Sequence, residues 1–304
     1  MQHPHTHNLQ ALQIREDLPE TWLADALQWF TPLAAELARQ HANIGHPLCV
    51  GINGAQGTGK STLAKTLVMM LEDQYQLKAV ALSLDDFYLS RSHRAQLAND
   101  IHPLLATRGV PGTHNTALAI RTLENLEAGQ SVRLPQFSKA TDDTVPDALW
   151  PESGPQVDII ILEGWCVGLG PQPPETLEEP VNELEANEDP QGVWRRFANT
   201  HLATDYQALF AQLDFLIMLK APDFEHIFQW RCQQEEKLAT RLAANPNDEP
   251  LRLMTPEQIR RFIALYQRLT QHALATLPAR ADITFELGAD HRITRRSQIS
   301  ASTS

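Results

Sequence analysis

Cysteine, excess positive charge and long apolar runs are all scarce in this chain of 304 residues. The three cysteines, Cys49, Cys166 and Cys232, are scattered without metal-binding spacing or the even framework of a disulfide-rich protein, which favours a reducing cytoplasm. The net charge of −12 argues against a broad nucleic-acid or membrane surface, where a basic patch is expected. No apolar run approaches the length of about 18 residues needed to span a bilayer. The N-terminus lacks the basic and apolar pattern of a signal peptide. We therefore expect a cytoplasmic protein without nucleic-acid or membrane partners.

What the chain does contain is a glycine-rich segment at residues 54–61 that matches G-x-x-x-x-G-K-[ST], the phosphate-binding loop of many nucleotide hydrolases and kinases. The apolar run at 48–52 before it reads as a buried strand, and residues 62–71 after it have helical spacing. The glycines let the backbone curl so that its N–H groups point at phosphates, and the helix N-terminus adds a positive dipole end. The expected nucleotide-binding residues are Gly54, Ala55, Gln56, Gly57, Thr58, Gly59, Lys60, Ser61 and Thr62. Lys60 is expected to reach the β- and γ-phosphates and Ser61 to ligate magnesium.

Acidic residues follow two further predicted strands. The strand at 78–84 ends in Asp85 and Asp86, at the edge of the sheet where ligands bind in such folds. Because neighbouring side chains on a strand point to opposite faces, only one of the two aspartates is expected to face the site. The strongly apolar run at 157–162 ends in Glu163, which fits a second residue on the metal side.

The segment at 108–115 precedes a predicted helix at about 116–128 that is capped by Asn115. Taken alone, this is a loop and a cap. Arg108 and His114 are surplus to that structural task, which makes them candidates for binding an anionic substrate group. The sequence leaves both interpretations open.

Strands alternate with helices along the chain, which predicts an α/β fold with a mostly parallel sheet covered on both faces. We expect an N-terminal tail and helix at 1–46, with residues 1–18 loose and a helix through Trp22 to Leu37. One large domain is expected at 47–290, including a short strand at 132–134 and an exposed acidic excursion at 171–192. A polar tail is expected at 291–304.

With these motifs assembled, the chain resembles the P-loop kinases of small metabolites: uridine kinase, phosphoribulokinase, pantothenate kinase and, more closely, the glycerate 3-kinase group and its kinase-like relatives. The resemblance rests on the phosphate loop and on four further segments in the same order, at residues 83–88, 108–114, 162–165 and 230–235. It implies the P-loop NTPase fold, with ATP and Mg²⁺ as cofactors and a small-molecule alcohol as acceptor. The chain is expected to be a monomer or homodimer.

The resemblance also implies roles for individual residues. Asp85 matches the carboxylate that accepts the proton of the substrate hydroxyl, and Glu163 lies near magnesium. Arg231 lies in the region that supplies a lid arginine over the transferring phosphoryl group. On the acceptor side the corresponding residues are Asp85, Tyr88, Arg108, His114 and Lys139. The chain departs from the pattern at Asn115, where an aspartate often stands, and at Ser138, which replaces the aspartate of a Pro-x-Phe-Asp-Lys segment.

The resulting hypothesis is a catalytic set of Lys60, Asp85 and Arg231 that transfers the γ-phosphoryl group of ATP to D-glycerate, giving 3-phosphoglycerate. Arg108 and Lys139 can pair with the glycerate carboxylate. One alternative is a nucleoside or pantothenate-type kinase, which shares every residue on the nucleotide side. The other is a nucleotide-hydrolysing switch or assembly factor. Guanine-specific switches usually carry Asn-Lys-x-Asp, and this chain has no such segment.

Overall fold

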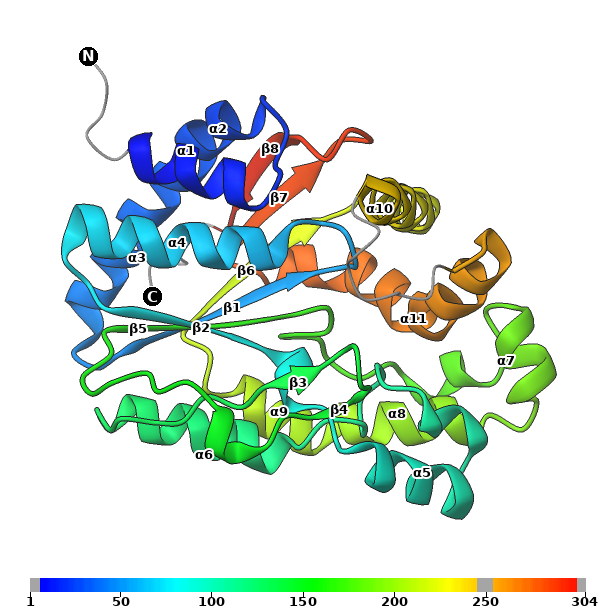
Figure 1. The fold of residues 1–304 in the computed structure, drawn as a ribbon. Helices are drawn as coiled ribbons and strands as arrows, with labels where there is room; N and C mark the ends of the chain where they lie inside the picture. Colours follow the sequence, from blue (N-terminus) through cyan, green and yellow to red (C-terminus); the bar gives the residue numbers. More distant parts are fainter. Residues whose placement is uncertain (1–5, 245–253, 300–304) are drawn as a thin grey trace.

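A computed structural model describes residues 6–244 and 254–299 of the chain. Its centre is a six-stranded sheet in the order β2-β5-β1-β6-β7-β8 (Figure 1). The first five strands in this order run parallel, and β8 pairs antiparallel with β7. The expected mostly parallel α/β sheet is confirmed. The strands are β1 (Leu48–Gly54), β2 (Ala79–Ser83), β5 (Ile159–Gly164), β6 (Phe215–Lys220), β7 (Ile283–Leu287) and β8 (Ile293–Gln298).

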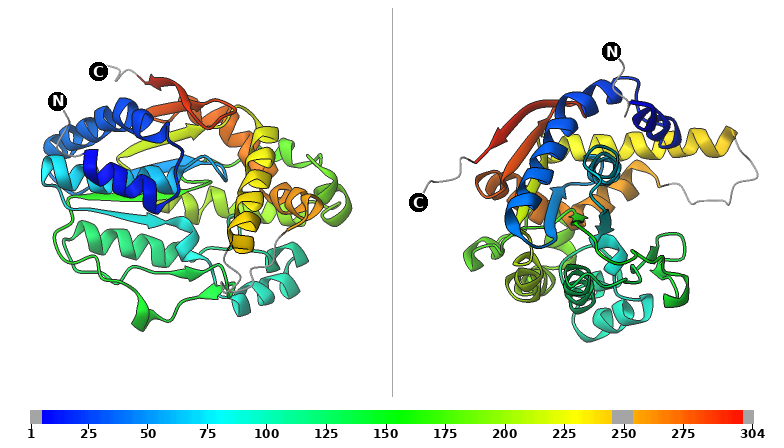
Figure 2. Two further views of the ribbon diagram at one scale, coloured as in Figure 1. Left: turned by 45° about the horizontal axis from the view of Figure 1, so that its top comes forward. Right: turned by 90° about the vertical axis from the view of Figure 1, so that its left-hand side faces the viewer.

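Alternate residues of the central strands pack against different helical layers on the two faces of the sheet. Val50 and Ile161 belong to one buried cluster, whereas Cys49 and Ile160 belong to the other. This follows from the two-residue period of a strand buried on both faces. Figures 1 and 2 show helices on both sides of the sheet. The first face is covered by α1 (Thr6–Arg15), α2 (Trp22–Asp25), the π-helical η1 (Ala26–Phe30), α3 (Thr31–Ile44), α4 (Lys60–Tyr75) and α10 (Phe224–Ala244).

The second face is covered by helices whose apolar stripes meet the other side of the strands. Leu123 and Leu269, from two different helices, lie in this second cluster. The helices are α6 (Thr116–Glu127), α9 (Asp205–Phe210) and α11 (Pro256–Thr276), which is extended by the 3₁₀ turn η6 (Leu277–Ala279). The apolar stripe of α11, which includes Ile259, Ile263 and Leu269, is therefore core. No helix of the described ranges is long and apolar enough to cross a membrane.

A third, smaller buried cluster includes Leu105, Val110 and Trp194. It joins α5 (Arg91–Asp100), the 3₁₀ turn η3 (Pro103–Ala106), α7 (Glu183–Glu188) and α8 (Val193–Ala203), with residues of α11 packed against it. The 3₁₀ turn η2 (Leu84–Phe87) belongs to the cluster of the second face. The other short elements are the paired strands β3 (Phe137–Ser138) and β4 (Asp143–Thr144) and the 3₁₀ turns η4 (Asp147–Leu149) and η5 (Pro174–Leu177).

Three local expectations were wrong. Residues Thr6–Arg15 are helical rather than loose, because Leu9 and Leu12 are buried. The expected strand at 132–134 is only an isolated bridge between Arg133 and Glu152. In the expected polar tail at 291–304, Ile293–Gln298 form the edge strand β8, while 300–304 lie outside the described residues.

The acidic segment at 171–192 is not exposed throughout. Glu185 is fully buried and receives hydrogen bonds from the guanidinium of Arg268 at 2.6 and 2.8 Å. Asp189 is buried with Arg195, at 3.1 Å. Because a buried carboxylate needs a partner, these pairs tie the segment to α11 and α8.

Candidate active site

The phosphate loop joins the carboxyl end of β1 to the start of α4, as the sequence predicts. Gly57 and Gly59 have φ values of 83° and 87°, a region that L side chains rarely adopt. The Thr58 hydroxyl donates to the Ala55 carbonyl at 2.8 Å and closes the turn. Helix α4 begins at Lys60, so its first free N–H groups lie at the loop. The backbone here is built to receive an anion.

The metal side of the site consists of Ser61 and Glu163. Strand β5 pairs with β1, with Glu163 opposite Ile52, and this register brings the carboxylate beside the loop. The Ser61 hydroxyl donates to Glu163 Oε1 at 2.6 Å. Glu163 Oε2 is buried without a hydrogen-bond partner. A hydroxyl and an unsatisfied carboxylate oxygen are ligand types that Mg²⁺ takes in phosphate-binding sites, so these residues fit the ion.

Asp85 and Asp86 lie in the 3₁₀ turn η2 after β2, not on the strand itself. The geometry of this turn, and not the alternation of a strand, therefore sets the directions of the two side chains. Asp86 Oδ1 accepts the Phe137 N–H at 3.1 Å and so anchors β3. Asp85 Oδ2 accepts from the Lys139 ammonium at 2.8 Å.

The two aspartates also differ in pKa. Burial raises the pKa of Asp86 to about 6, against a hydrogen bond from the Phe137 N–H and with added repulsion from Asp85. Burial acts on Asp85 in the same direction, but the ammonium groups of Lys139 and Lys60 outweigh it and lower its pKa. Asp85 is therefore the ionised carboxylate that shares the field of the phosphate-loop lysine.

On the acceptor side, the candidate cations are already paired. Arg108 forms an ion pair with Asp142, and its guanidinium lies 5.6 Å from the centroid of the Phe137 ring. The buried Arg94 holds the same aspartate at 3.0 Å. Lys139 and Asp142 both lie in the turn between β3 and β4, so this one turn carries the Lys139–Asp85 pair and the partner of Arg108.

His114 and Tyr88 face each other across a single antiparallel bridge, and their rings stack with centroids 4.3 Å apart. Both side chains are buried, and Tyr88 interacts with Asp85. Burial lowers the pKa of His114 to about 4, so the imidazole is neutral near pH 7. The Nδ1 atom of His114 forms a hydrogen bond with the Tyr206 hydroxyl, and the other ring nitrogen, Nε2, has no hydrogen-bond partner. The structure thus joins Tyr88 and His114 to the cluster around Asp85.

Arg231 is not part of this cluster. It lies on α10 and forms a salt bridge with Glu235, one turn further along, at 2.8 Å. Its neighbour Trp230 and Gln234, both on α10, pack at the phosphate loop, since a Cβ added to Gly57 would lie 3.3 Å from the Trp230 Cβ and 3.4 Å from the Gln234 Nε2. The Trp230 ring stacks on His291, whose Nδ1 lies 3.1 Å from the Gly57 carbonyl oxygen.

Several residues of the site had not been identified from the sequence. Trp230 lies in the segment at 230–235 that contributes to the family resemblance, but nothing in the local sequence predicts its contact with Gly57. The others, Asp142, Tyr206 and His291, come from segments distant in the sequence. Only the fold brings them to the site.

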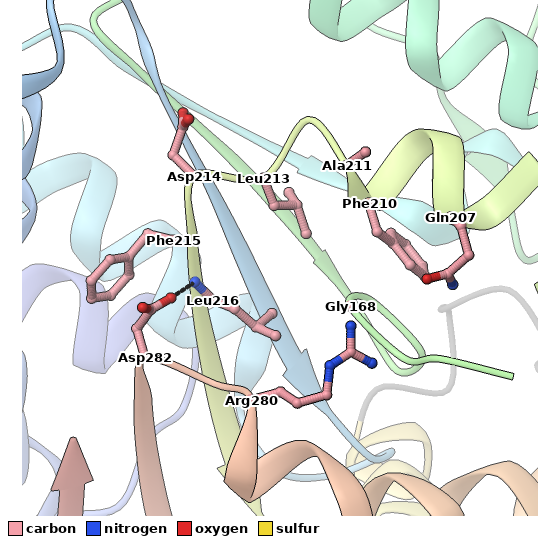
Figure 3. A pocket seen from close by; sticks show the side chains of 10 residues that line it. All are labelled: Gly168, Gln207, Phe210, Ala211, Leu213, Asp214, Phe215, Leu216, Arg280 and Asp282. Atoms are coloured by element: carbon pink, nitrogen blue, oxygen red, sulfur yellow. Dashed lines mark hydrogen bonds between the residues drawn. The ribbon is translucent and has the colours of Figure 1, made fainter. Parts of the chain in front are cut away.

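A cavity of about 460 Å³ lies away from all of these residues (Figure 3). It is lined by Asp214 and Asp282, which directly precede β6 and β7, and by the side chain of Arg280. The phosphate loop follows the carboxyl end of β1, and these strands are parallel. The cavity therefore lies at the amino ends of the strands, away from the loop. The two carboxylates already accept backbone N–H groups, from Cys49 and Leu216. It is not the active site.

Comparisons with known proteins identify the family and the fold. The model of the phosphoribulokinase/uridine kinase family matches residues 49–169. An uncharacterized kinase of Schizosaccharomyces pombe, mug58, is 33% identical over 223 residues, which cover 70% of this chain and 79% of that protein.

The chloroplastic D-glycerate 3-kinase of Arabidopsis thaliana is 27% identical over 246 residues, 78% of this chain but only half of that protein. The solved structure of D-glycerate 3-kinase from Cryptococcus neoformans superimposes with a TM-score of 0.73 at 26% identity, covering 90% of this chain and 98% of that one. The chain is an enzyme, a P-loop kinase, and it belongs to the phosphoribulokinase/uridine kinase family.

Proposed function

We propose that this kinase transfers the γ-phosphoryl group of ATP to a hydroxyl of D-glycerate, giving 3-phosphoglycerate and ADP. The observation that carries the proposal is the Lys139 ammonium seated on Asp85, the candidate base, at 2.8 Å. A cation next to the base suits an acceptor that carries a carboxylate beside its reacting hydroxyl, as glycerate does. Arg108 supplies a second cation, paired with Asp142 in the same turn as Lys139. The similarity to two proteins named D-glycerate 3-kinase supports the same acceptor.

In this proposal the acceptor hydroxyl forms the new P–O bond while the bond from the γ-phosphorus to the bridging oxygen breaks. The hydroxyl proton passes to Asp85, and ADP leaves with the bridging oxygen. Lys60 and the N–H groups of the phosphate loop stabilise charge on the transferring group, since phosphoryl transfer depends mainly on positioning and electrostatics. Arg231 joins them only after its salt bridge with Glu235 opens.

Ser61 and Glu163 would hold Mg²⁺, which neutralises phosphate charge when bound. The unpartnered Glu163 Oε2 supports this assignment. Replacing Glu163 with Gln keeps the shape and removes the charge, and we expect the Mg²⁺ concentration for half-maximal activity to rise by about 10- to 100-fold. An unchanged Mg²⁺ requirement would remove Glu163 from the metal site.

The test is ATP turnover with D-glycerate, L-glycerate, pantothenate and uridine as acceptors, with ³¹P NMR to identify the phosphorylated position. The Lys60→Ala variant serves as the blank. Turnover that depends on D-glycerate and vanishes in the variant would establish the acceptor. Dependence on pantothenate or uridine would keep the kinase and overturn the acceptor, while turnover indifferent to all four would favour a nucleotide-hydrolysing switch.

A further inference from the structure

The buried hydroxyl of Tyr206 has two hydrogen-bonding neighbours that together fix the direction of its proton. The backbone N–H of Gly112 donates to its oxygen at 3.2 Å, so this contact cannot accept the Tyr206 proton. The Tyr206 proton is then directed to the remaining contact, His114 Nδ1.

If Nδ1 accepts this proton, the neutral imidazole of His114 carries its own hydrogen on Nε2. The opposite tautomer would place a second donor beside the Gly112 N–H on the hydroxyl oxygen and leave the Tyr206 proton without an acceptor among the hydrogen bonds of the described residues. Nε2 is buried and has no hydrogen-bond partner. A buried N–H donor without a partner costs about 1–3 kcal/mol, so a site keeps one where a ligand or an ordered water satisfies it.

The two carboxylates whose charges act on the His114 ring are engaged with other groups. Asp85 Oδ2 is held by Lys139, and Asp205 accepts from Thr116 at 2.8 Å and contacts His201 at 3.0 Å. The ring is also held in place by the stacked Tyr88. His114 Nε2 is thus a fixed, unused donor in the wall that contains the candidate base.

We propose that Tyr206 is a positioning residue that locks His114 in the Nε2–H tautomer, so that the ring donates a hydrogen bond to an oxygen of the bound acceptor. Acceptor binding at this site rests on the proposed function, whereas the tautomer does not. The oxygen belongs to a carboxylate or another group that does not react, because a donor on the attacking hydroxyl would draw away the lone pair that forms the P–O bond. An acceptor without such an oxygen leaves the donor unpaired and is disfavoured.

The tautomer is read directly by long-range ¹H–¹⁵N NMR of protein labelled with ¹⁵N-histidine, at pH 7 and without substrate. The signals of His114 are assigned by their absence from the spectrum of His114→Asn. We expect the nitrogen shifts of the Nε2–H form in the wild-type chain and mixed or Nδ1–H shifts in Tyr206→Phe, which keeps the ring. The Nδ1–H form in the wild type, or identical shifts in Tyr206→Phe, would overturn the proposal.

Kinetics then test the link to the acceptor. For whichever compound of the acceptor panel is turned over, we expect Tyr206→Phe to raise KM for the acceptor by about 5- to 20-fold, as for one lost hydrogen bond, with KM for ATP unchanged. Tyr75→Phe, at an exposed tyrosine of α4, is the matched control. Equal effects on both KM values, or none on the acceptor KM, would show a structural role only. If D-glycerate fails but another acceptor shows the expected change, the proposed function falls and the role of Tyr206 stands.

Discussion

On the nucleotide side, Lys60 forms no hydrogen bond or salt bridge with the described part of the chain, and Glu163 keeps a free carboxylate oxygen. On the acceptor side, Lys139 holds Asp85, Arg108 holds Asp142, and Tyr206 holds His114. The first half is open and ready for an anion. In the second half Lys139, Arg108 and the Tyr206 hydroxyl are already paired, and of the ring nitrogens of His114 only Nε2 has no partner, so acceptor binding to the two cations has to exchange partners. We infer that nucleotide affinity is set by preorganised groups and acceptor affinity by the cost of releasing these pairs.

The strongest test of this contrast is Lys60→Ala. Removing a preorganised cation from the transferring phosphoryl group should cost about 3–4 kcal/mol or more in the barrier, a loss of at least roughly 10²–10³ in kcat. Steady-state kinetics with saturating ATP and acceptor measure it. Lys65→Ala is the control, because Lys65 lies on the same helix but pairs with Glu16 at the surface. A loss in kcat below tenfold would mean that Lys60 does not stabilise the transferring phosphoryl group.

Next in size is Asp85→Asn, which tests whether the acceptor half contains the base. A general base contributes about 10²–10⁴-fold, and a loose transition state places Asp85 near the lower end, about 10². Asp86→Asn is the matched control, since Asp86 holds the Phe137 N–H rather than Lys139. If kcat falls less than about threefold in Asp85→Asn, Asp85 is not the base and the pairing with Lys139 is only structural.

The surroundings of Lys60 and Asp85 also differ in how far the sequence predicts their structure. The phosphate loop, its strand and helix α4 depend on local glycines and apolar spacing, and all were predicted within a few residues. The 3₁₀ turn that orients Asp85 and Asp86 was not, because the alternation of a strand was assumed to continue through them.

The remaining surprises depend on partners far away in the chain. Glu185 is buried because Arg268 lies against it, 83 residues later, and local composition around Glu185 indicates only exposure. Strand β8 is polar and forms at the sheet edge through pairing with β7. Tyr206 and Asp142 likewise reach the site from elements that no local motif connects to it.

A smaller effect is expected from Asp142→Asn, which removes the ion pair of Arg108 but keeps both cations of the acceptor side. Residue 142 has a φ of 54°, which asparagine tolerates, and Arg94 keeps its bond to the Asp142 carbonyl at 2.7 Å. Arg108 loses its counter-charge. Because half-exposed ion pairs are worth about 0–1 kcal/mol, KM for a carboxylate acceptor should fall by up to about fivefold.

KM for ATP should not change in Asp142→Asn. Asp143→Asn is a less suitable control, since Asp143 accepts the Arg91 N–H at 3.0 Å, so the exposed Asp147→Asn is preferred. A rise in acceptor KM would indicate that Asp142 holds Arg108 in its binding position, and the acceptor half would then be preorganised like the other half.

The last prediction concerns stability and pH at Asp86. Its pKa is raised from 3.8 to about 6, so between these values the folded protein holds a proton that the unfolded chain releases. The stabilisation is therefore complete below about pH 4 and is lost as the pH rises through 6. His114, whose pKa is lowered to about 4, acts in the opposite sense, since its unfolded form binds a proton below pH 6.5. That contribution is common to the wild type and Asp86→Asn and cancels in their difference. Urea unfolding should show Asp86→Asn at least as stable as the wild type at pH 7.5 and without that advantage at pH 4. An equal loss of stability at both pH values would mean that the bond to the Phe137 N–H, and not the buried charge, decides the stability of this turn.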